Sequence, residues 1–226
     1  MGDFFKGYYE PEVTRLIKEV LNPGDVIVDI GANVGVHTLV MAKEVGNKGK
    51  VYAFEPHPEI SKRLLSNINL NKFNNVKVSN NALSNNTGEL DFFVHNPKRL
   101  HKGQSTFYKE HLDGEARKIK VEVDTLDNFA EKNKLKKINL IKIDTEGNDF
   151  KVLQGTEEVI KNFSPNLIFE FEKDSWALAD NSFDDAYNFL KDKDYEIYKI
   201  CKNRKLKKIN NTNYSNSMMT FSKKMI

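Results

Sequence analysis

Cysteine and long apolar runs are what this chain has least of. Cys201 is the single cysteine among 226 residues, which excludes an internal disulfide framework and indicates a reducing compartment. No apolar run approaches the length of a membrane span, and no charged segment followed by an apolar one opens the chain. The sequence therefore predicts a cytoplasmic protein with no membrane span.

An excess of charge of one sign is also missing. The 35 basic and 32 acidic residues leave a formal net charge of +3, so no global electrostatic argument for nucleic-acid binding arises. The densest basic run, residues 202–208, falls where a loop is expected to join the last two strands, and we interpret it as a solvated loop. The composition thus disfavours nucleic acid as a partner.

The length of the chain suits one domain. At 226 residues it can bury a core that needs no disulfide or metal to hold it together. We therefore expect a single domain over residues 1–226, which begins with a helical segment at residues 1–22.

The most informative motif is a buried strand that leads through a glycine-rich turn into a helix. Apolar and β-branched residues dominate residues 25–30, and helical spacing starts at Val36, so the chain must turn sharply between Gly31 and Gly35. A dinucleotide site requires G-x-G-x-x-G, whereas Asn33 and Val36 take the places of its second and third glycines. The pattern favours S-adenosylmethionine, which has no pyrophosphate, over NAD. A close helix-strand contact is the alternative reading of two glycines alone.

An acid follows the second predicted strand, at residues 49–54. Glu55 comes about 20 residues after the glycine turn, where a carboxylate can accept hydrogen bonds from both ribose hydroxyls. A third predicted strand, at residues 76–79, leads to Asn81, which could read an adenine edge. The alternatives are a solvated acid for Glu55 and an asparagine favoured by a turn for Asn81.

Repeated strand and helix patterns predict an α/β fold with a doubly wound, mostly parallel sheet. Residues 138–143 and 165–171 each precede a helical pattern, which implies right-handed crossovers. Residues 88–123 are interpreted as a β-rich insertion near the pocket, whose polar middle could contact an acceptor. Residues 195–201 and 217–221 predict two antiparallel strands at the end of the chain.

Five short segments carry a resemblance to a known family. They are Pro23–Gly35, Ala53–Pro56, Asn81–Ser84, Ile143–Gly147 and Val152–Gly155. In this order they resemble the FkbM family of methyltransferases, a branch of the class I S-adenosylmethionine-dependent enzymes, over roughly residues 10–221.

The resemblance implies a Rossmann-like fold, S-adenosyl-L-methionine as the cofactor, and O-methylation of a hydroxyl on a sugar, glycolipid or secondary metabolite. It also implies cofactor contacts from Gly31, Asn33 and Gly35 to the amino-acid part, from Glu55 to the ribose, and from Asn81 and Ala82 to the adenine.

Acids lie at or near the ends of four predicted parallel strands. An open sheet binds its ligand beyond the carboxyl ends of its strands, so one crevice is expected to collect Asp29, Glu55, Asp144 and Glu170. Pairing several carboxylates raises the pKa of at least one of them, which suits a general base.

Among the acids at or after the predicted strand ends, we predict Asp144, Glu146 and Glu170 as catalytic residues. Asp29 and Asp144 also belong to the predicted cofactor pocket. His37, early on the first helix after the turn, is expected to point at the cofactor carboxylate.

Other readings of the same acids stay open. Glu146 would fit a helix N-terminus, where exposed N–H groups favour acids. Asp144, Glu170 and Glu172 offer oxygen ligands that Mg²⁺ accepts, but the lysine base typical of metal-dependent relatives does not follow Asp144. We predict no metal.

Segments that mark nucleic-acid methyltransferases are missing. An Asp-Thr-Glu-Gly run at 144–147 stands where DNA amino-methylating enzymes carry Pro-Pro-aromatic, and Glu170 stands where 2′-hydroxyl methylating enzymes use a lysine. We therefore predict methyl transfer to a small molecule or glycan. The alternatives are a nucleic-acid methyltransferase, an NAD-dependent enzyme, and a non-catalytic cofactor-binding or partner subunit.

Overall fold

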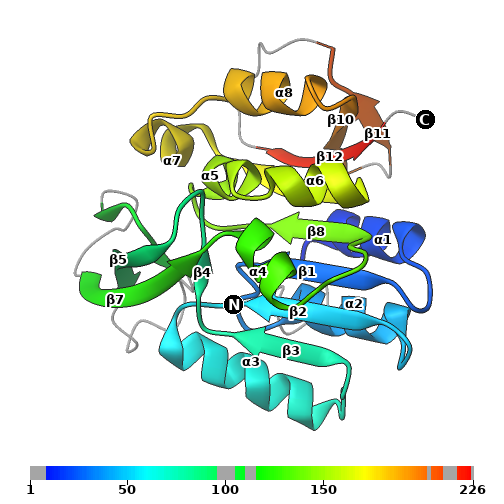
Figure 1. Cartoon of the computed structure of the whole chain (residues 1–226), viewed down its shortest axis with the longest axis vertical. Coiled ribbons are helices and arrows are strands. Elements are labelled where there is room, and N and C mark those ends of the chain that lie inside the picture. Colours follow the sequence, from blue (N-terminus) through cyan, green and yellow to red (C-terminus); the bar gives the residue numbers. More distant parts are fainter. Residues whose placement is uncertain (1–8, 96–104, 110–115, 203–204, 211–217, 225–226) are drawn as a thin grey trace.

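A central sheet of eight strands organises the protein (Figure 1). The structure is a computed structural model that describes residues 9–95, 105–109, 116–202, 205–210 and 218–224. The strands of the sheet are β1 (Val26–Ile30), β2 (Lys50–Phe54), β3 (Val76–Ser79), β8 (Leu140–Ile143), β9 (Asn166–Phe171), β10 (Tyr195–Ile200), β11 (Leu206–Lys208) and β12 (Met218–Lys224). In space they follow the order β11-β10-β12-β9-β8-β1-β2-β3.

The pairing of the strands confirms the predicted fold class. Strands β3, β2, β1, β8 and β9 run parallel, and β12 lies antiparallel between β9 and β10. The order reverses at β1, because β2 and β3 lie on one side of it and β8 and β9 on the other. Such a switch point opens a crevice at the carboxyl ends of the strands.

One part of the C-terminal prediction is wrong. Residues 206–208, interpreted as solvated loop, form β11, which pairs antiparallel with residues 198–200 of β10. All three side chains of β11 are exposed, so this edge strand has no alternation of apolar and polar residues that would reveal it.

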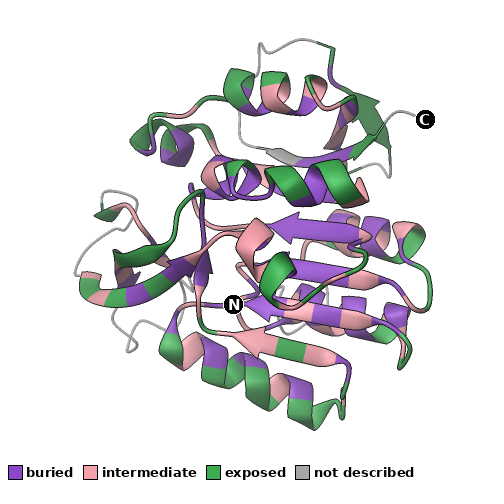
Figure 2. Ribbon diagram, in the orientation of Figure 1, coloured by how far each residue is buried: buried purple, intermediate pink, exposed green. Residues whose placement is uncertain are grey.

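Helices cover both faces of the sheet. They are α1 (Pro11–Val20), α2 (Val36–Val45) and α3 (Pro58–Leu70) on one face, and α4 (Leu126–Lys132), α5 (Asp149–Gln154), α6 (Glu157–Phe163), α7 (Lys173–Leu178) and α8 (Phe183–Lys191) on the other. The side chains of neighbouring strand residues pack on opposite faces of the sheet. Ile27 packs with α1 and α2, whereas Val28 packs with the layer of α4 to α8. Purple along the central strands in Figure 2 marks this burial on both faces. None of the described helices is long and apolar enough to cross a bilayer.

The predicted insertion is rich in β-structure, and together with the strand that precedes it, it forms a second, smaller sheet. Its strands are β4 (Ala82–Leu83), β5 (Gly88–His95), β6 (Ser105–Thr106) and β7 (Ala116–Asp124), in the order β4-β7-β5-β6. Figure 1 shows this sheet beside the carboxyl ends of β1, β2 and β8. The Thr106 hydroxyl donates to the backbone oxygen of Glu146 at 2.9 Å, so β6 is attached to the loop after β8. The polar middle of the insertion, predicted to contact an acceptor, falls largely at residues 96–104 and 110–115, outside the described residues.

Candidate functional site

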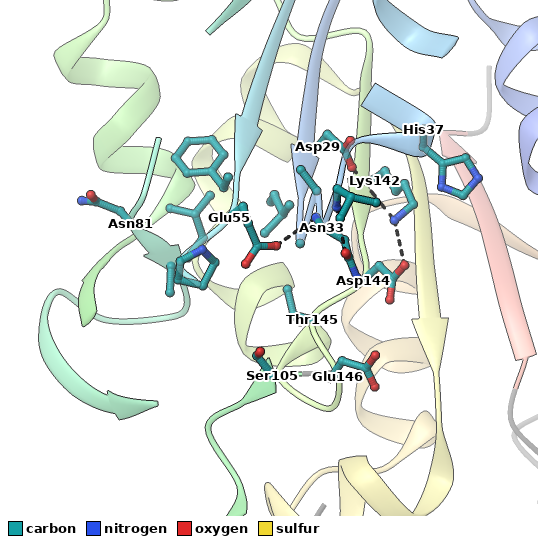
Figure 3. Close-up of a pocket in the computed structure, with 18 of the residues that line it drawn as sticks. Asp29, Asn33, His37, Glu55, Asn81, Ser105, Lys142, Asp144, Thr145 and Glu146 are labelled. Atoms are coloured by element: carbon teal, nitrogen blue, oxygen red, sulfur yellow. Dashed lines mark hydrogen bonds and ion pairs between the residues drawn. The ribbon is translucent and has the colours of Figure 1, made fainter. Parts of the chain in front are cut away.

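A cavity of about 850 Å³, counting the space open to solvent, lies at the carboxyl ends of β1, β2 and β8 (Figure 3). It brings together most of the predicted site residues, namely Asp29, Gly31, Asn33, His37, Glu55, Asn81, Ala82, Asp144 and Glu146. Gly35 and Glu170 do not line it. We call this cavity the strand-end pocket.

The turn after β1 is held by contacts within the protein. Gly31 has a φ of 76°, and a Cβ at this position would lie 1.8 Å from the backbone oxygen of Asp144. Asn33 adopts a φ of 50°, a left-handed conformation that costs free energy in a residue other than glycine. Gly35, with a φ of 94°, faces Leu64 of α3 rather than the pocket. The glycines therefore shape the turn through close packing against the neighbouring elements.

Glu55 closes the turn from the end of β2. Its Oε2 accepts from the backbone N–H of Asn33 and its Oε1 from the backbone N–H of His57, both at 2.9 Å. Burial raises the pKa of Glu55 to about 7, against the lowering effect of these two bonds. Each carboxylate oxygen has a second lone pair, so Glu55 can still accept hydrogen bonds from a ligand.

Three charged side chains form one end of the strand-end pocket. Nζ of Lys142, in the middle of β8, lies 2.9 Å from Oδ2 of Asp144 and 4.0 Å from Oδ1 of Asp29. Burial lowers the pKa of Lys142, but the two carboxylates outweigh that effect and raise it above its ordinary value. Oδ2 of Asp29 accepts from the Thr38 hydroxyl at 2.5 Å. Lys142 is thus a buried cation at the base of the pocket.

His37, which was expected to point at the cofactor carboxylate, lies beside this charged end, as Figure 3 shows. Burial and then Lys142 lower the pKa of His37 to about 3, so its imidazole is neutral near pH 7. Its Nε2 is 3.8 Å from Oε2 of Glu10, and its ring is 5.7 Å from that of Tyr9. A neutral His37 offers no positive charge to a ligand carboxylate.

The acids after β8 have different surroundings. Glu146 lines the pocket with a φ of 53°, ahead of the helix whose first turn holds Asp149 instead. Asp149 accepts from the backbone N–H groups of Thr145 and Gly147 at 3.1 and 3.2 Å, and burial followed by repulsion from Asp144 raises its pKa to about 7. Asp149 is thus the acid that holds this loop.

Glu170 and Glu172, at the end of β9, stand apart from the pocket lining. Burial and then the carboxylates of Asp144 and Asp149 raise the pKa of Glu170 to about 9, so it carries a proton near neutral pH. Glu172 is the N-cap of α7 and accepts from the backbone N–H of Ser175 at 2.6 Å. Within the described part of the chain, no three His, Cys, Asp or Glu side chains gather so that they could hold a metal ion.

Sequence reasoning missed several lining residues, namely Tyr9, Phe92, Ser105, Phe107 and Lys142. Only Lys142 had a visible signal, because it is a charged residue inside a predicted buried strand. The others come from the N-terminal segment and the insertion, whose position relative to the sheet no local pattern encodes.

Two observations describe the polar groups that the pocket offers to a ligand. Figure 3 places Asn81 at one end, Glu55 and Asn33 in the middle, and the charged group of Asp29 and Lys142 at the other end. Oδ1 of Asp29 is buried and has no hydrogen-bond partner in the described structure. This oxygen is therefore available to accept a hydrogen bond from a ligand.

Comparisons with known proteins agree with this geometry. Residues 29–197, more than half of the chain, match the family model described as the methyltransferase FkbM domain. The hexuronic acid methyltransferase AglP of Haloferax volcanii is 26% identical over 153 residues, which cover 68% of this chain and 59% of that protein. Methyltransferase 1 of Beauveria bassiana is 28% identical over 163 residues, covering 64% and 63% of the two chains.

The solved structure of a methyltransferase FkbM from Methylobacillus flagellatus shares the fold. It superposes with a TM-score of 0.56 at 16% identity, over 92% of this chain and 50% of that one. The chain therefore spans about three fifths of the length of these two curated relatives and half of this structural neighbour.

Proposed function

The chain belongs to the FkbM methyltransferase family, and from this premise we propose that it transfers a methyl group from S-adenosylmethionine to a hydroxyl on a sugar, glycolipid or secondary metabolite. The observation that carries the proposal is the strand-end pocket itself. It places the glycine turn, Glu55 and Asn81 on one continuous surface with Asp144 and Glu146. The residues proposed for the cofactor and the candidate bases thus line one cavity.

The residues divide into a binding set and a transfer set. Asn81 and Ala82 would hold the adenine, Glu55 the ribose, and the turn from Gly31 to Asn33 the amino-acid part. When bound, S-adenosylmethionine supplies an electrophilic methyl group on a sulfonium. The protein must align the acceptor and exclude water, and alignment alone can lower a barrier by roughly 7 to 11 kcal/mol.

Removal of the hydroxyl proton needs a base near the acceptor. Glu146 is the best placed acid, because it lines the pocket beside β6, whereas the Asp144 carboxylate already accepts a hydrogen bond from Lys142. Glu170 is a weaker candidate at neutral pH because it is protonated and lies outside the lining. A general base contributes roughly 10²- to 10⁴-fold to such reactions.

The sugar part of the proposal is supported by the similarity to a protein named a hexuronic acid methyltransferase. The test is incubation of the protein with S-adenosylmethionine that carries a labelled methyl group, together with a panel of neutral sugars, uronic acids and hydroxylated aglycones. Mass spectrometry would find the label on an oxygen of one acceptor class. No label on any acceptor, with the cofactor bound, would favour a non-catalytic binding subunit instead.

A nucleic-acid methyltransferase is the alternative that the same assay separates. Transcribed tRNA and ribosomal RNA fragments enter the panel beside the sugars. Label on a base nitrogen and none on the sugars would reject the proposed acceptor class while keeping the cofactor assignment.

A further inference from the structure

Lys142 has unused hydrogen-bonding capacity inside the strand-end pocket. It lies on β8, whose four residues are all buried, and its side chain is 3% exposed. An ammonium group has three N–H donors. Within the described structure, one of them is used by Asp144 at 2.9 Å, and the 4.0 Å separation from Asp29 is too long for a hydrogen bond.

Asp29 has an oxygen that lacks a hydrogen-bond donor among the described residues. One carboxylate oxygen accepts from Thr38, but the other, which faces Lys142, is buried without a hydrogen-bond partner. Asp29 is 1% exposed and lines the same pocket. Nζ of Lys142, which has unused N–H donors, therefore lies 4.0 Å from the unpartnered Oδ1 of Asp29. A buried polar atom without a hydrogen-bond partner costs free energy.

A zwitterionic α-amino acid satisfies both groups at once, because it carries a carboxylate and an ammonium on one carbon. The charged pair lies at the opposite end of the pocket from Asn81 (Figure 3), which is where the amino-acid part of the proposed cofactor would fall. His37, the residue expected to meet the carboxylate, is neutral and cannot supply the positive charge. Among the lining residues that the structure describes, Lys142 is the cation at this end of the pocket.

We propose that Lys142 binds the carboxylate of the amino-acid part of S-adenosylmethionine, while the free oxygen of Asp29 accepts from its ammonium. This inference rests on the proposed function. It gives Lys142 a role in selecting the cofactor, because a nucleoside that lacks the amino-acid group can form a hydrogen bond to neither Lys142 nor the free oxygen of Asp29.

The test is a calorimetric ligand series on the wild-type protein. The probes are S-adenosylhomocysteine, its analogue without the carboxylate, its analogue without the amino group, and 5′-methylthioadenosine, which lacks both. Loss of a charged hydrogen bond corresponds to about a tenfold to hundredfold weaker Kd, and we expect that loss when the carboxylate is removed. Equal affinity, within about twofold, for the decarboxylated analogue and S-adenosylhomocysteine would overturn the inference.

Variants assign the effect to Lys142. Lys142→Met should bind S-adenosylhomocysteine about tenfold to hundredfold more weakly, yet bind the decarboxylated analogue as the wild type does. Lys136→Met, at an exposed position just before β8, is the matched control and should match the wild type with every probe. A similar loss for both ligands in Lys142→Met would reduce Lys142 to a structural residue.

Two safeguards keep the test decisive. Lys142→Met leaves buried carboxylates unpaired, so the double variant Lys142→Met with Asp144→Asn removes both members of the ion pair. If neither variant folds, the wild-type ligand series still decides. Failure of both S-adenosylhomocysteine and 5′-methylthioadenosine to bind would contradict the proposed function, whereas equal binding of the two would contradict only the role of Lys142.

Discussion

The backbone N–H of Asn33 donates a hydrogen bond to Oε2 of Glu55 at 2.9 Å. This bond joins the turn after β1 to the end of β2, at a point where Asn33 holds a φ of 50°. The two residues belong to the two sequence motifs from which a cofactor pocket was predicted. Glu55 therefore stabilises the turn in addition to the ribose contact proposed for it.

Replacing Glu55 by Ala should weaken S-adenosylhomocysteine binding at least tenfold. The change removes the carboxyl group proposed as the acceptor for the ribose, and it leaves the N–H groups of Asn33 and His57 without their partner. Titration calorimetry on the folded variant measures the effect. Glu131→Ala, at an exposed position on α4, is the control. A Kd unchanged in Glu55→Ala would mean that the carboxylate does not serve the pocket.

Gly31→Ala should be far more destabilising than Gly46→Ala, although both glycines have positive φ. A Cβ on Gly31 would lie 1.8 Å from the Asp144 backbone oxygen, whereas one on Gly46 meets nothing within 4 Å. Backbone strain at a positive φ costs about 1 to 3 kcal/mol in either variant, and overpacking against the Asp144 backbone adds about 1 to 3 kcal/mol at Gly31 only. Urea unfolding of the two variants gives the difference, and equal losses would argue against the close approach of β1 to the end of β8.

Glu146→Gln should leave the Kd for S-adenosylhomocysteine within about twofold and slow methyl transfer by roughly 10²- to 10⁴-fold, the contribution of a general base. Single-turnover transfer of labelled methyl to the identified acceptor measures the rate. Glu170→Gln is the matched comparison: Gln imitates the protonated carboxyl expected there at neutral pH, so we expect a much smaller change. Wild-type rates in both variants would place the base elsewhere, with the insertion as the next region to search.

Asp149 should make the stability of the protein depend on pH. Its pKa is about 7 in the folded protein, above the ordinary 3.8, so the folded state retains a proton that the unfolded state has lost. Its contribution to stability is fully present below pH 3.8 and is lost as pH rises to about 7, which amounts to about 4 kcal/mol for a shift of this size.

The measurement is the free energy of unfolding between pH 4.5 and 7.5. An asparagine side chain cannot titrate, so the stability of Asp149→Asn should fall less steeply with pH over this range than that of the wild type. The slopes should differ by up to the value for one proton, about 1.4 kcal/mol per pH unit. Asn also replaces an acceptor of the N–H groups of Thr145 and Gly147, so we expect lower stability at acid pH. Parallel pH profiles for the two proteins would show that Asp149 ionises normally.

The parallel part of the fold was predictable because each strand is covered on both faces. Strands such as β1 and β8 are therefore continuous apolar runs, and the acids that follow them mark their ends. The strand-end pocket could be predicted from the same rule, since the carboxyl ends of parallel strands meet at one edge. Asp29, Glu55 and Asp144 accordingly line one cavity.

The features that could not be predicted depend on how distant segments pack together or lie on exposed parts of the chain. Glu170 was expected in the same crevice, yet β9 lies one strand beyond β8 and its end falls outside the pocket lining. The exposed edge strand β11 has no apolar pattern, and the contribution of Ser105 and Phe107 depends on how the insertion packs against the loop at Glu146. The location in the cytoplasm, expected from the lone cysteine, stays a prediction.

The central claim is that the strand-end pocket binds S-adenosylmethionine, and calorimetric titration of the purified protein with S-adenosylmethionine, S-adenosylhomocysteine and NAD tests it most directly. We predict saturable binding of the first two at a single site and no binding of NAD, because Asn33 replaces the glycine that a pyrophosphate would need. Glu55→Ala should weaken both binding events. Binding of NAD, or of none of the three, would contradict the account.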